Sequence, residues 1–125
     1  MAYYKKTYYS NGQIREEVFV NNNKYEGEYK SYFENGIIAR YCNHINGKIE
    51  GDFINYWNNG KIAYICNMTN GSYNGIFKSY HTNGKLEEEF NYIDGRINGL
   101  YKKFDFNGNL EKITYYYDDE EYFPI

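Results

Sequence analysis

The chain repeats itself every 24 residues, and this period constrains the fold more than any other feature of the sequence. The clearest copy reads Tyr-Trp-Asn-Asn-Gly-Lys-Ile and occupies residues 56–62. Its counterparts follow with no insertion anywhere and begin at Tyr8, Tyr32, Tyr80 and Phe104. A strict period of this length is typical of stacked supersecondary units, each of which buries its apolar side chains against its neighbours.

The repeat also sets the domain organisation. A chain of 125 residues suits one domain, and no stretch of it has the composition of a linker. We therefore predict a single domain over residues 1–125, with a degenerate half unit at residues 1–7. The repeats start at residues 8, 32, 56, 80 and 104.

Turn residues divide each repeat into two strands. One turn signal is the Asn-Gly of the opening motif, as at Asn59-Gly60, and a second lies midway between copies, as at Asn46-Gly47. Such pairs are strong signals for two-residue hairpins, because a type I′ turn needs positive φ at both central residues. About nine to eleven residues separate successive turns, which is enough for a full strand.

The composition agrees with an all-β fold. The chain has 18 Tyr and 12 Gly, and its one proline, Pro124, interrupts no predicted strand. Tyr favours strands, whereas Asn and Gly favour turns. We predict an elongated, twisted antiparallel β-meander of stacked hairpins, with ten or eleven strands in a single-layer or curled sheet.

Two further patterns concern the strands. Gly27, Gly51, Gly75 and Gly99 recur inside the longer strand, each after Glu or Asn, which indicates a bulge or a bend. If the Asn-Gly turns are two-residue loops, opposed side chains share a face. The opposed pairs would then be Trp57–Ile62, Phe53–Cys66, Tyr9–Ile14, Phe33–Ile38 and Tyr29–Cys42. A bulge at the turn glycine would instead shift the register by one residue and exchange some of these assignments.

These pairs define one apolar face and leave the Tyr residues of the opening motif on the other. No amphipathic helix is predicted that would cover the apolar face. The sheet must therefore curl on itself, pair with another copy, or offer that face to a partner.

The recurring pattern Tyr-aromatic-x-Asn-Gly-x-Ile/Leu, followed by Asn/Asp-Gly and Glu/Asn-Gly, resembles the variant branch of the MORN-repeat family. The resemblance covers residues 8–117. It implies a ladder of β-hairpins used for binding or scaffolding, with no shared catalytic motif. Bacterial members of this branch resemble antitoxins or immunity proteins, which neutralise a toxin by occupying it.

Residues that could carry chemistry are few. Cys42 and Cys66 occupy the same position in adjacent repeats, roughly 9–10 Å apart at the usual strand spacing. A disulfide rarely spans more than about 7 Å between Cα atoms, so we predict two free thiols. His44 and His81 lie at different repeat positions, without the spacing of a triad or metal site. We expect no enzyme, no cofactor and no metal.

A protein partner is the expected ligand, and exposed Tyr and Trp side chains are common interface anchors. The acidic residues near the end of the chain could meet a basic patch on a toxin nuclease, although protection of a sheet edge is the favoured interpretation. The candidate partner-binding residues are Tyr32, Tyr56, Trp57, Tyr80, Lys30, Lys78, Asp118, Asp119, Glu120 and Glu121.

Charge and patterning limit the alternatives. The net charge of −3 disfavours nucleic acid and anionic membranes. The chain has no apolar run of about 18 residues and no signal-peptide pattern, so we expect a cytoplasmic protein. The leading hypothesis is an antitoxin- or immunity-type inhibitor of a protein, such as a toxin or nuclease encoded nearby. The alternative is a scaffold that self-associates, for example as a homodimer through the apolar face, or docks at a membrane surface.

Overall fold

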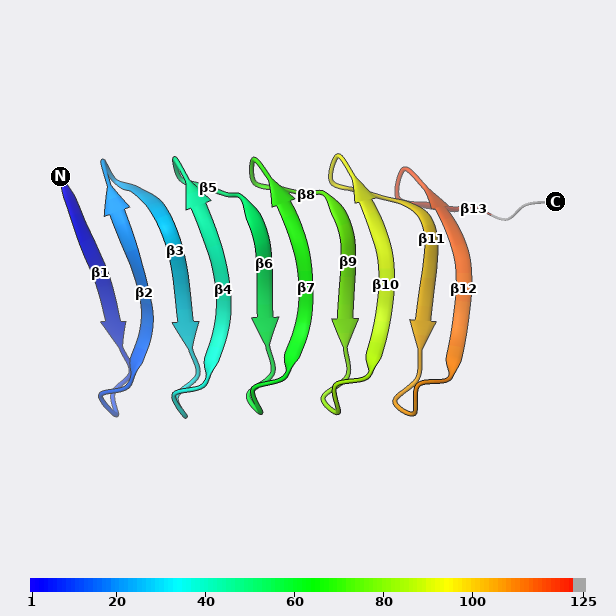
Figure 1. The fold of residues 1–125 in the computed structure, drawn as a ribbon, viewed down its shortest axis with the longest axis horizontal. Coiled ribbons are helices and arrows are strands. Elements are labelled where there is room, and N and C mark those ends of the chain that lie inside the picture. Colours follow the sequence, from blue (N-terminus) through cyan, green and yellow to red (C-terminus); the bar gives the residue numbers. More distant parts are fainter. Residues whose placement is uncertain (123–125) are drawn as a thin grey trace.

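The computed structural model describes residues 1–122, and every regular element in that range is a β-strand (Figure 1). The strands are β1 (Ala2–Tyr8), β2 (Ile14–Asn21), β3 (Lys24–Tyr32), β4 (Ile38–Ile45), β5 (Lys48–Ile49), β6 (Gly51–Tyr56), β7 (Ile62–Thr69), β8 (Ser72–Tyr73), β9 (Gly75–Tyr80), β10 (Leu86–Ile93), β11 (Arg96–Phe104), β12 (Leu110–Tyr117) and β13 (Glu120–Tyr122).

All strands belong to one antiparallel sheet in which neighbours in sequence are neighbours in space. The order is β1-β2-β3-β4-β6-β7-β9-β10-β11-β12-β13, and the short strands β5 and β8 pair with β4 and β7. They are the first pieces of two long strands that are interrupted at Glu50 and Asn74. The prediction of an all-β meander of stacked hairpins is therefore confirmed.

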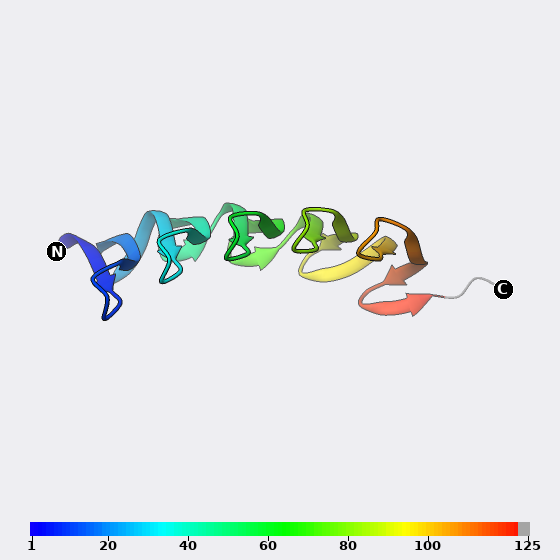
Figure 2. The same ribbon diagram turned by 90° about the horizontal axis from the view of Figure 1, so that it is seen from below.

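The sheet is a single open layer. Seen from below, the hairpins follow one another along the long axis, and the two ends of the sheet lie far apart (Figure 2). Of the two predicted forms, single-layer and curled, the single-layer form is correct. Because each hairpin pairs only with the hairpins before and after it, the fold extends by repetition rather than by closure.

The hairpins at one end of the sheet are two-residue turns, as predicted. Asn46 and Gly47 have φ values of 54° and 85°, and Ile45 pairs with Lys48 across the turn. Positive φ at both central residues is the requirement of a type I′ turn, which matches the right-handed twist of the flanking strands.

The Asn-Gly loops at the other end differ from the prediction. In the loop described between Tyr56 and Ile62, Gly60 is the one residue with positive φ, and its N–H donates to the carbonyl of Trp57 at 3.0 Å. The N–H of Trp57 in turn donates to the carbonyl of Lys61 at 2.7 Å. This is a type I turn followed by a glycine bulge rather than a two-residue turn.

The bulge corrects three of the predicted pairs. Tyr56, not Trp57, lies opposite Ile62, and the register shifts between Asn55 and Tyr56. The pairs predicted as Tyr9–Ile14 and Phe33–Ile38 were wrong for the same reason, since the structure pairs Tyr8–Ile14 and Tyr32–Ile38. Beyond the bulge the predicted register holds, and Phe53–Cys66 and Tyr29–Cys42 are confirmed.

The asparagine of each Asn-Gly loop connects its repeat to the next. The side-chain oxygen of Asn59 accepts from the N–H of Lys61 at 2.9 Å, and its amide donates to the carbonyl of Thr82 at 2.9 Å. The equivalent donations run from Asn11 to Glu34, from Asn35 to Asn58 and from Asn83 to Phe106. The same residue therefore shapes its own loop and holds the following one.

The glycine inside each long strand forms the predicted bulge. Val18 pairs with Tyr29 but the next residue, Phe19, pairs with Glu26, which leaves Gly27 in the bulge with a φ of 79°. The carboxylate of Glu26 accepts from the N–H of Asn46 in the next turn at 2.7 Å. Glu50 and Asn98 do the same for Asn70 and Asp118. The polar residue before each of these glycines thus caps a turn of the following repeat.

The buried side chains lie on one face of the sheet, which we call the apolar face. Its most buried apolar members are Val18, Val20, Cys42, Phe53, Cys66, Met68 and Phe90. No second layer lies over this face among the described residues, so the side chains are buried only by their neighbours on adjacent strands. We call the opposite face, which carries Lys30, Tyr32, Lys78 and Tyr80, the mixed face.

We expect Asn59→Ala to lower the free energy of unfolding by about 1 kcal/mol, because the substitution removes both hydrogen bonds of the side chain at an exposed site. Urea denaturation followed by tyrosine fluorescence would measure the change. Asn58→Ala is the matched control, since Asn58 is exposed and its hydrogen bond to Asn35 uses the backbone carbonyl. Equal stability of the two variants would contradict the bridging role of Asn59.

Candidate binding surfaces

The apolar face carries a continuous row of aromatic rings in the C-terminal half of the sheet. The ring centroids are 6.1 Å apart for Phe53–Tyr64, 5.5 Å for Tyr64–Phe77, 4.7 Å for Phe77–Phe90 and 5.5 Å for Phe90–Tyr101, and all four pairs are stacked. The row crosses strands β6, β7, β9, β10 and β11. We call these five residues the aromatic row.

In the N-terminal repeats, the positions equivalent to the aromatic row carry more polar residues. Lys5 forms an ion pair with Glu16 at 3.2 Å, and the hydroxyl of Tyr29 donates to Glu16 at 2.9 Å. Burial, together with this carboxylate, raises the pKa of Tyr29 to about 12, so its hydroxyl stays protonated as a donor. The guanidinium of Arg40 lies 5.1 Å from the ring centre of Phe53, where the polar part of the face meets the aromatic row.

The predicted tyrosines lie on the mixed face and are partly buried. The hydroxyl of Tyr32 donates to Glu17 on the neighbouring strand at 2.9 Å, and burial and this carboxylate raise its pKa. Tyr56 and Tyr80 occupy the equivalent positions on β6 and β9. Lys30 and Lys78 lie two residues earlier than Tyr32 and Tyr80 and form ion pairs of 3.6 Å with Glu28 and Glu89.

Trp57 is separate from this tyrosine series and lies in the loop that follows β6. Its indole N–H donates to the carbonyl of Tyr80 at 3.1 Å. Tyr9 makes the equivalent bond to Tyr32 at 2.6 Å, and the imidazole of His81 contacts the carbonyl of Phe104 at 2.9 Å. The side chain of Trp57 therefore links two successive repeats. The predicted two-residue turn had instead placed Trp57 in a strand, opposite Ile62.

The acidic residues at the end of the sheet are largely engaged within the chain. Asp118 forms an ion pair with Arg96 at 2.7 Å, and Asp119 accepts from the N–H of Ile97 at 2.7 Å. Glu121 forms an ion pair with Lys112, whereas Glu120 is exposed on β13. The predicted site residues are thus distributed along the whole sheet from β3 to β13 and do not converge on one pocket.

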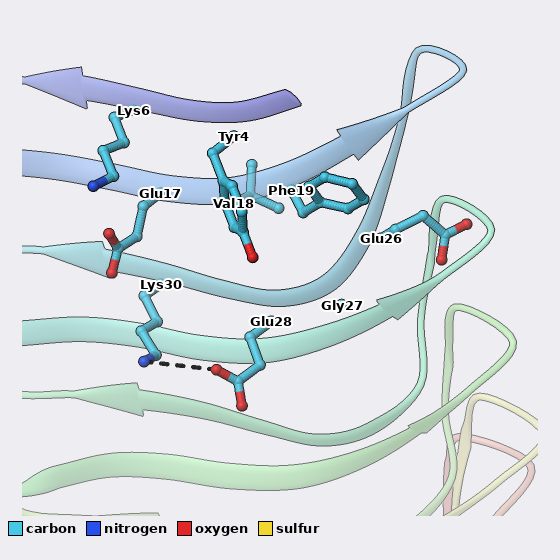
Figure 3. Close-up of a pocket in the computed structure, with 9 residues that line it drawn as sticks. All are labelled: Tyr4, Lys6, Glu17, Val18, Phe19, Glu26, Gly27, Glu28 and Lys30. Carbon is cyan, nitrogen blue, oxygen red and sulfur yellow. Dashed lines mark ion pairs between the residues drawn. The ribbon is translucent and has the colours of Figure 1, made fainter. Parts of the chain in front are cut away.

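Two hollows open on the mixed face, each beside a glycine bulge. The N-terminal hollow has a volume of about 590 Å³. Its lining residues are Tyr4, Lys6, Glu17, Val18, Phe19, Glu26, Gly27, Glu28 and Lys30, shown in Figure 3. The C-terminal hollow, of about 320 Å³, is lined three repeats later by Ile76, Glu89, Phe90, Asn91, Ile93, Asn98, Gly99, Leu100 and Lys102.

The hollows were not predicted, although their signal is present in the sequence. Both form where a glycine leaves the bulged strand without a side chain, and an ideal Cβ on Gly27 or Gly99 would find no atom within 4 Å. The recurring glycines therefore mark places where a hollow can form, in addition to the bulges predicted there. Of the predicted site residues, Lys30 lines the N-terminal hollow.

The described residues provide no catalytic or metal-binding constellation. No group of three His, Cys, Asp or Glu side chains among residues 1–122 could hold a metal ion. His44 is buried between Tyr25 and Tyr29, and burial lowers its pKa. Cys42 and Cys66 are free and buried, and burial raises the pKa of each thiol to about 11. Such thiols are poor nucleophiles, because the thiolate is the reactive form.

The described part of the chain is a repeat protein of β-hairpins in one sheet, with no second layer on either face. The chain belongs to the MORN repeat variant family, which it matches in five consecutive segments at residues 4–22, 25–46, 49–70, 73–94 and 97–119. The repeats of this family are binding modules without catalytic activity. No curated protein shows a significant match to the chain. None of the described residues forms a helix long and apolar enough to cross a membrane.

We expect the free energy of unfolding to fall as the pH rises from about 9 to about 11, because the folded state keeps both thiols protonated. The two thiols ionise near pH 9.0 when exposed and near pH 11 when folded, so their stabilising effect is complete below pH 9 and is lost through pH 11. Urea denaturation at a series of pH values would measure it.

A matched variant separates the thiols from the tyrosines, which also ionise at high pH. Cys42→Val/Cys66→Val copies the first repeat, where Val18 fills the same position. The double variant should lose less stability over this range than the natural chain. An identical pH dependence in both proteins would contradict the role of the buried thiols.

Proposed function

We propose that the protein is a protein-binding repeat module that acts as a stoichiometric inhibitor of the antitoxin or immunity kind. The observation that carries this proposal is the aromatic row on a sheet face that no second layer covers within residues 1–122. Phe53 and Phe90 are each 7% exposed, whereas Tyr64, Phe77 and Tyr101 are half-buried and offer part of their rings to a partner. Aromatic side chains are common anchors at interfaces.

The amount of exposed surface supports a protein partner. A compact protein of 15.0 kDa exposes about 7,000 Å². This chain exposes 7987 Å². The excess of roughly 1,000 Å² follows from the open single-layer sheet, which leaves room on one face for the area of about 800 Å² that each partner contributes to a standard protein interface.

The hydrogen bonds between repeats also support binding with little loss of conformational entropy. The side chains of Asn11, Asn35, Asn59 and Asn83 tie four pairs of successive loops together. Stacking holds the rings of the aromatic row in place before any partner arrives. A surface ordered in advance loses little freedom on association, which favours affinity.

The test is co-expression of the 125-residue chain with the product of an adjacent gene, followed by native mass spectrometry. We expect a one-to-one heterocomplex and loss of the partner's toxic activity. The absence of any complex under gentle conditions would contradict the proposal. Sedimentation that showed a homodimer instead would favour the alternative, a scaffold that self-associates through the apolar face.

A substitution within the aromatic row should weaken the complex by about tenfold or more, the effect expected of a central interface residue. Tyr64→Arg is suitable because Arg40 occupies the same position one repeat earlier, so the fold already accommodates this side chain. Tyr117→Arg is the matched control, since Tyr117 is 75% exposed and lies outside the row. Equal affinities for the two variants, measured by isothermal titration calorimetry, would exclude the aromatic row as the contact surface.

The predicted contacts on the mixed face are tested in the same assay. Tyr56→Ser and Tyr80→Ser remove rings from that face while leaving the aromatic row intact. A loss of affinity in these variants would place the partner on the mixed face, where the predicted partner-binding residues Tyr56 and Tyr80 lie.

A further inference from the structure

We propose that the N-terminal hollow receives an arginine side chain of a protein partner. This inference rests on the proposed function and adds to it the chemistry that one part of the mixed face would recognise. It concerns a surface opposite to the aromatic row, so the two contacts are structurally independent.

The shape of the hollow suits a long side chain with an apolar stem. The bulge at Gly27, with a φ of 79°, opens a volume of about 590 Å³ between strands β1, β2 and β3. Tyr4 and Phe19 form an aromatic wall, with ring centroids 5.1 Å apart at an angle of 55°. Tyr4 is 74% exposed, so its ring is available to a partner.

Three carboxylates at the hollow are held in place by donors from neighbouring strands or turns. Glu17 accepts from the hydroxyl of Tyr32 at 2.9 Å, and Glu26 accepts from the N–H of Asn46 at 2.7 Å. Glu28 accepts from the hydroxyl of Tyr41 at 3.2 Å. Each bond uses one carboxylate oxygen, and the second oxygen of Glu28 lies 3.6 Å from the ammonium of Lys30. Glu17 and Glu26 therefore supply the second oxygens that an incoming cation would meet, on side chains that are already ordered.

The charge balance favours a cation. The lining contains three glutamates and two lysines, which gives a net charge of −1. Lys30 is 3.6 Å from Glu28, and Figure 3 shows Glu17 between Lys6 and Lys30. The two lysines are therefore each beside a carboxylate, and Glu26 is the lining glutamate drawn farthest from both of them (Figure 3).

Arginine matches both properties of the hollow. Its planar guanidinium forms paired hydrogen bonds with carboxylates and stacks on aromatic rings, while its methylene stem packs against apolar walls. A partner with an exposed arginine also suits the net charge of −3 on the whole chain.

The C-terminal hollow is a natural control within the same molecule. It has the same glycine bulge, but Asn91, Asn98 and Leu100 stand where the first hollow has Phe19, Glu26 and Glu28. Its lining contains one glutamate and one lysine and is therefore neutral. It keeps the glycine bulge at a smaller volume, about 320 Å³ against about 590 Å³, and it lacks the Tyr4–Phe19 wall and the excess of negative charge.

The test is a titration of the full 125-residue chain with the tripeptide acetyl-Gly-Arg-Gly-amide, followed by two-dimensional ¹H–¹⁵N NMR. We expect saturable shifts of the amides of Tyr4, Phe19 and Gly27, and no comparable shift at Gly99. The same peptide with citrulline in place of arginine keeps the shape and loses the charge. It should bind about tenfold more weakly, as expected when a charge-assisted hydrogen bond is lost.

A double variant tests the carboxylates directly. Glu26→Gln/Glu28→Gln keeps an oxygen for the N–H of Asn46 and for the hydroxyl of Tyr41, so the fold should persist and the spectrum should confirm it. We expect its affinity for the arginine peptide to fall about tenfold. Unchanged affinity, equal binding of the citrulline peptide, shifts at Gly99 as large as at Gly27, tighter binding of a glutamate peptide, or no localised shifts would each overturn the inference.

The inference about the hollow and the proposed function can fail independently of each other. The peptide titration contains no protein partner, so its failure would leave the aromatic row and the co-expression result untouched. Conversely, a chain that binds the arginine peptide but forms no complex with a co-expressed protein would contradict the proposed inhibitor and not the chemistry of the hollow.

Discussion

The structure depends on hydrogen bonds that link each repeat to the next outside the strand ladders. Asn59 uses one side-chain amide to close its own loop and to hold the loop that begins the following repeat. At the other end of the sheet, the carboxylate of Glu26 links successive repeats by accepting from the N–H of Asn46 in the next turn. The asparagine contacts recur every 24 residues from Asn11 to Asn83, and the turn-capping contacts come from Glu26, Glu50 and Asn98. An insertion would break the alignment of all later repeats, which explains why none is present.

This mode of linkage lets a single-layer sheet persist without a second layer of structure. The buried side chains of the apolar face are covered by their neighbours on adjacent strands, as Cys42, Phe53 and Cys66 are. The loops at both ends are fixed by the turn glycines and by the bridging side chains. Among residues 1–122 no second layer covers either face, so the protein carries a partly buried row of aromatic rings on one face and two hollows on the other.

Much of the fold could be predicted from the period and the turn residues, and the failures have physical causes. Phe53–Cys66 was predicted correctly because the register shift between Asn55 and Tyr56 compensates for the longer loop, so the pairing beyond it is that of a two-residue turn. Trp57 was misassigned because Asn-Gly serves both two-residue turns and type I turns with a glycine bulge, and flanking residues do not distinguish them. Glu26 carried no signal of its capping role, since its acceptor function depends on a turn 20 residues away. The candidate surfaces were less predictable, because the period and the turn residues do not show whether a second layer covers the aromatic row.

The central claim is that the sheet is open and both faces are uncovered in solution. Small-angle X-ray scattering of the purified chain tests it most directly. A compact protein of 125 residues has a radius of gyration of about 14 Å. Eleven strands in one path, spaced about 4.8 Å apart, instead span roughly 48 Å before loops and side chains are added. A monomeric mass with a radius of gyration well above 14 Å and an elongated profile is the expected result. A compact profile near 14 Å, or a dimeric mass, would contradict the account.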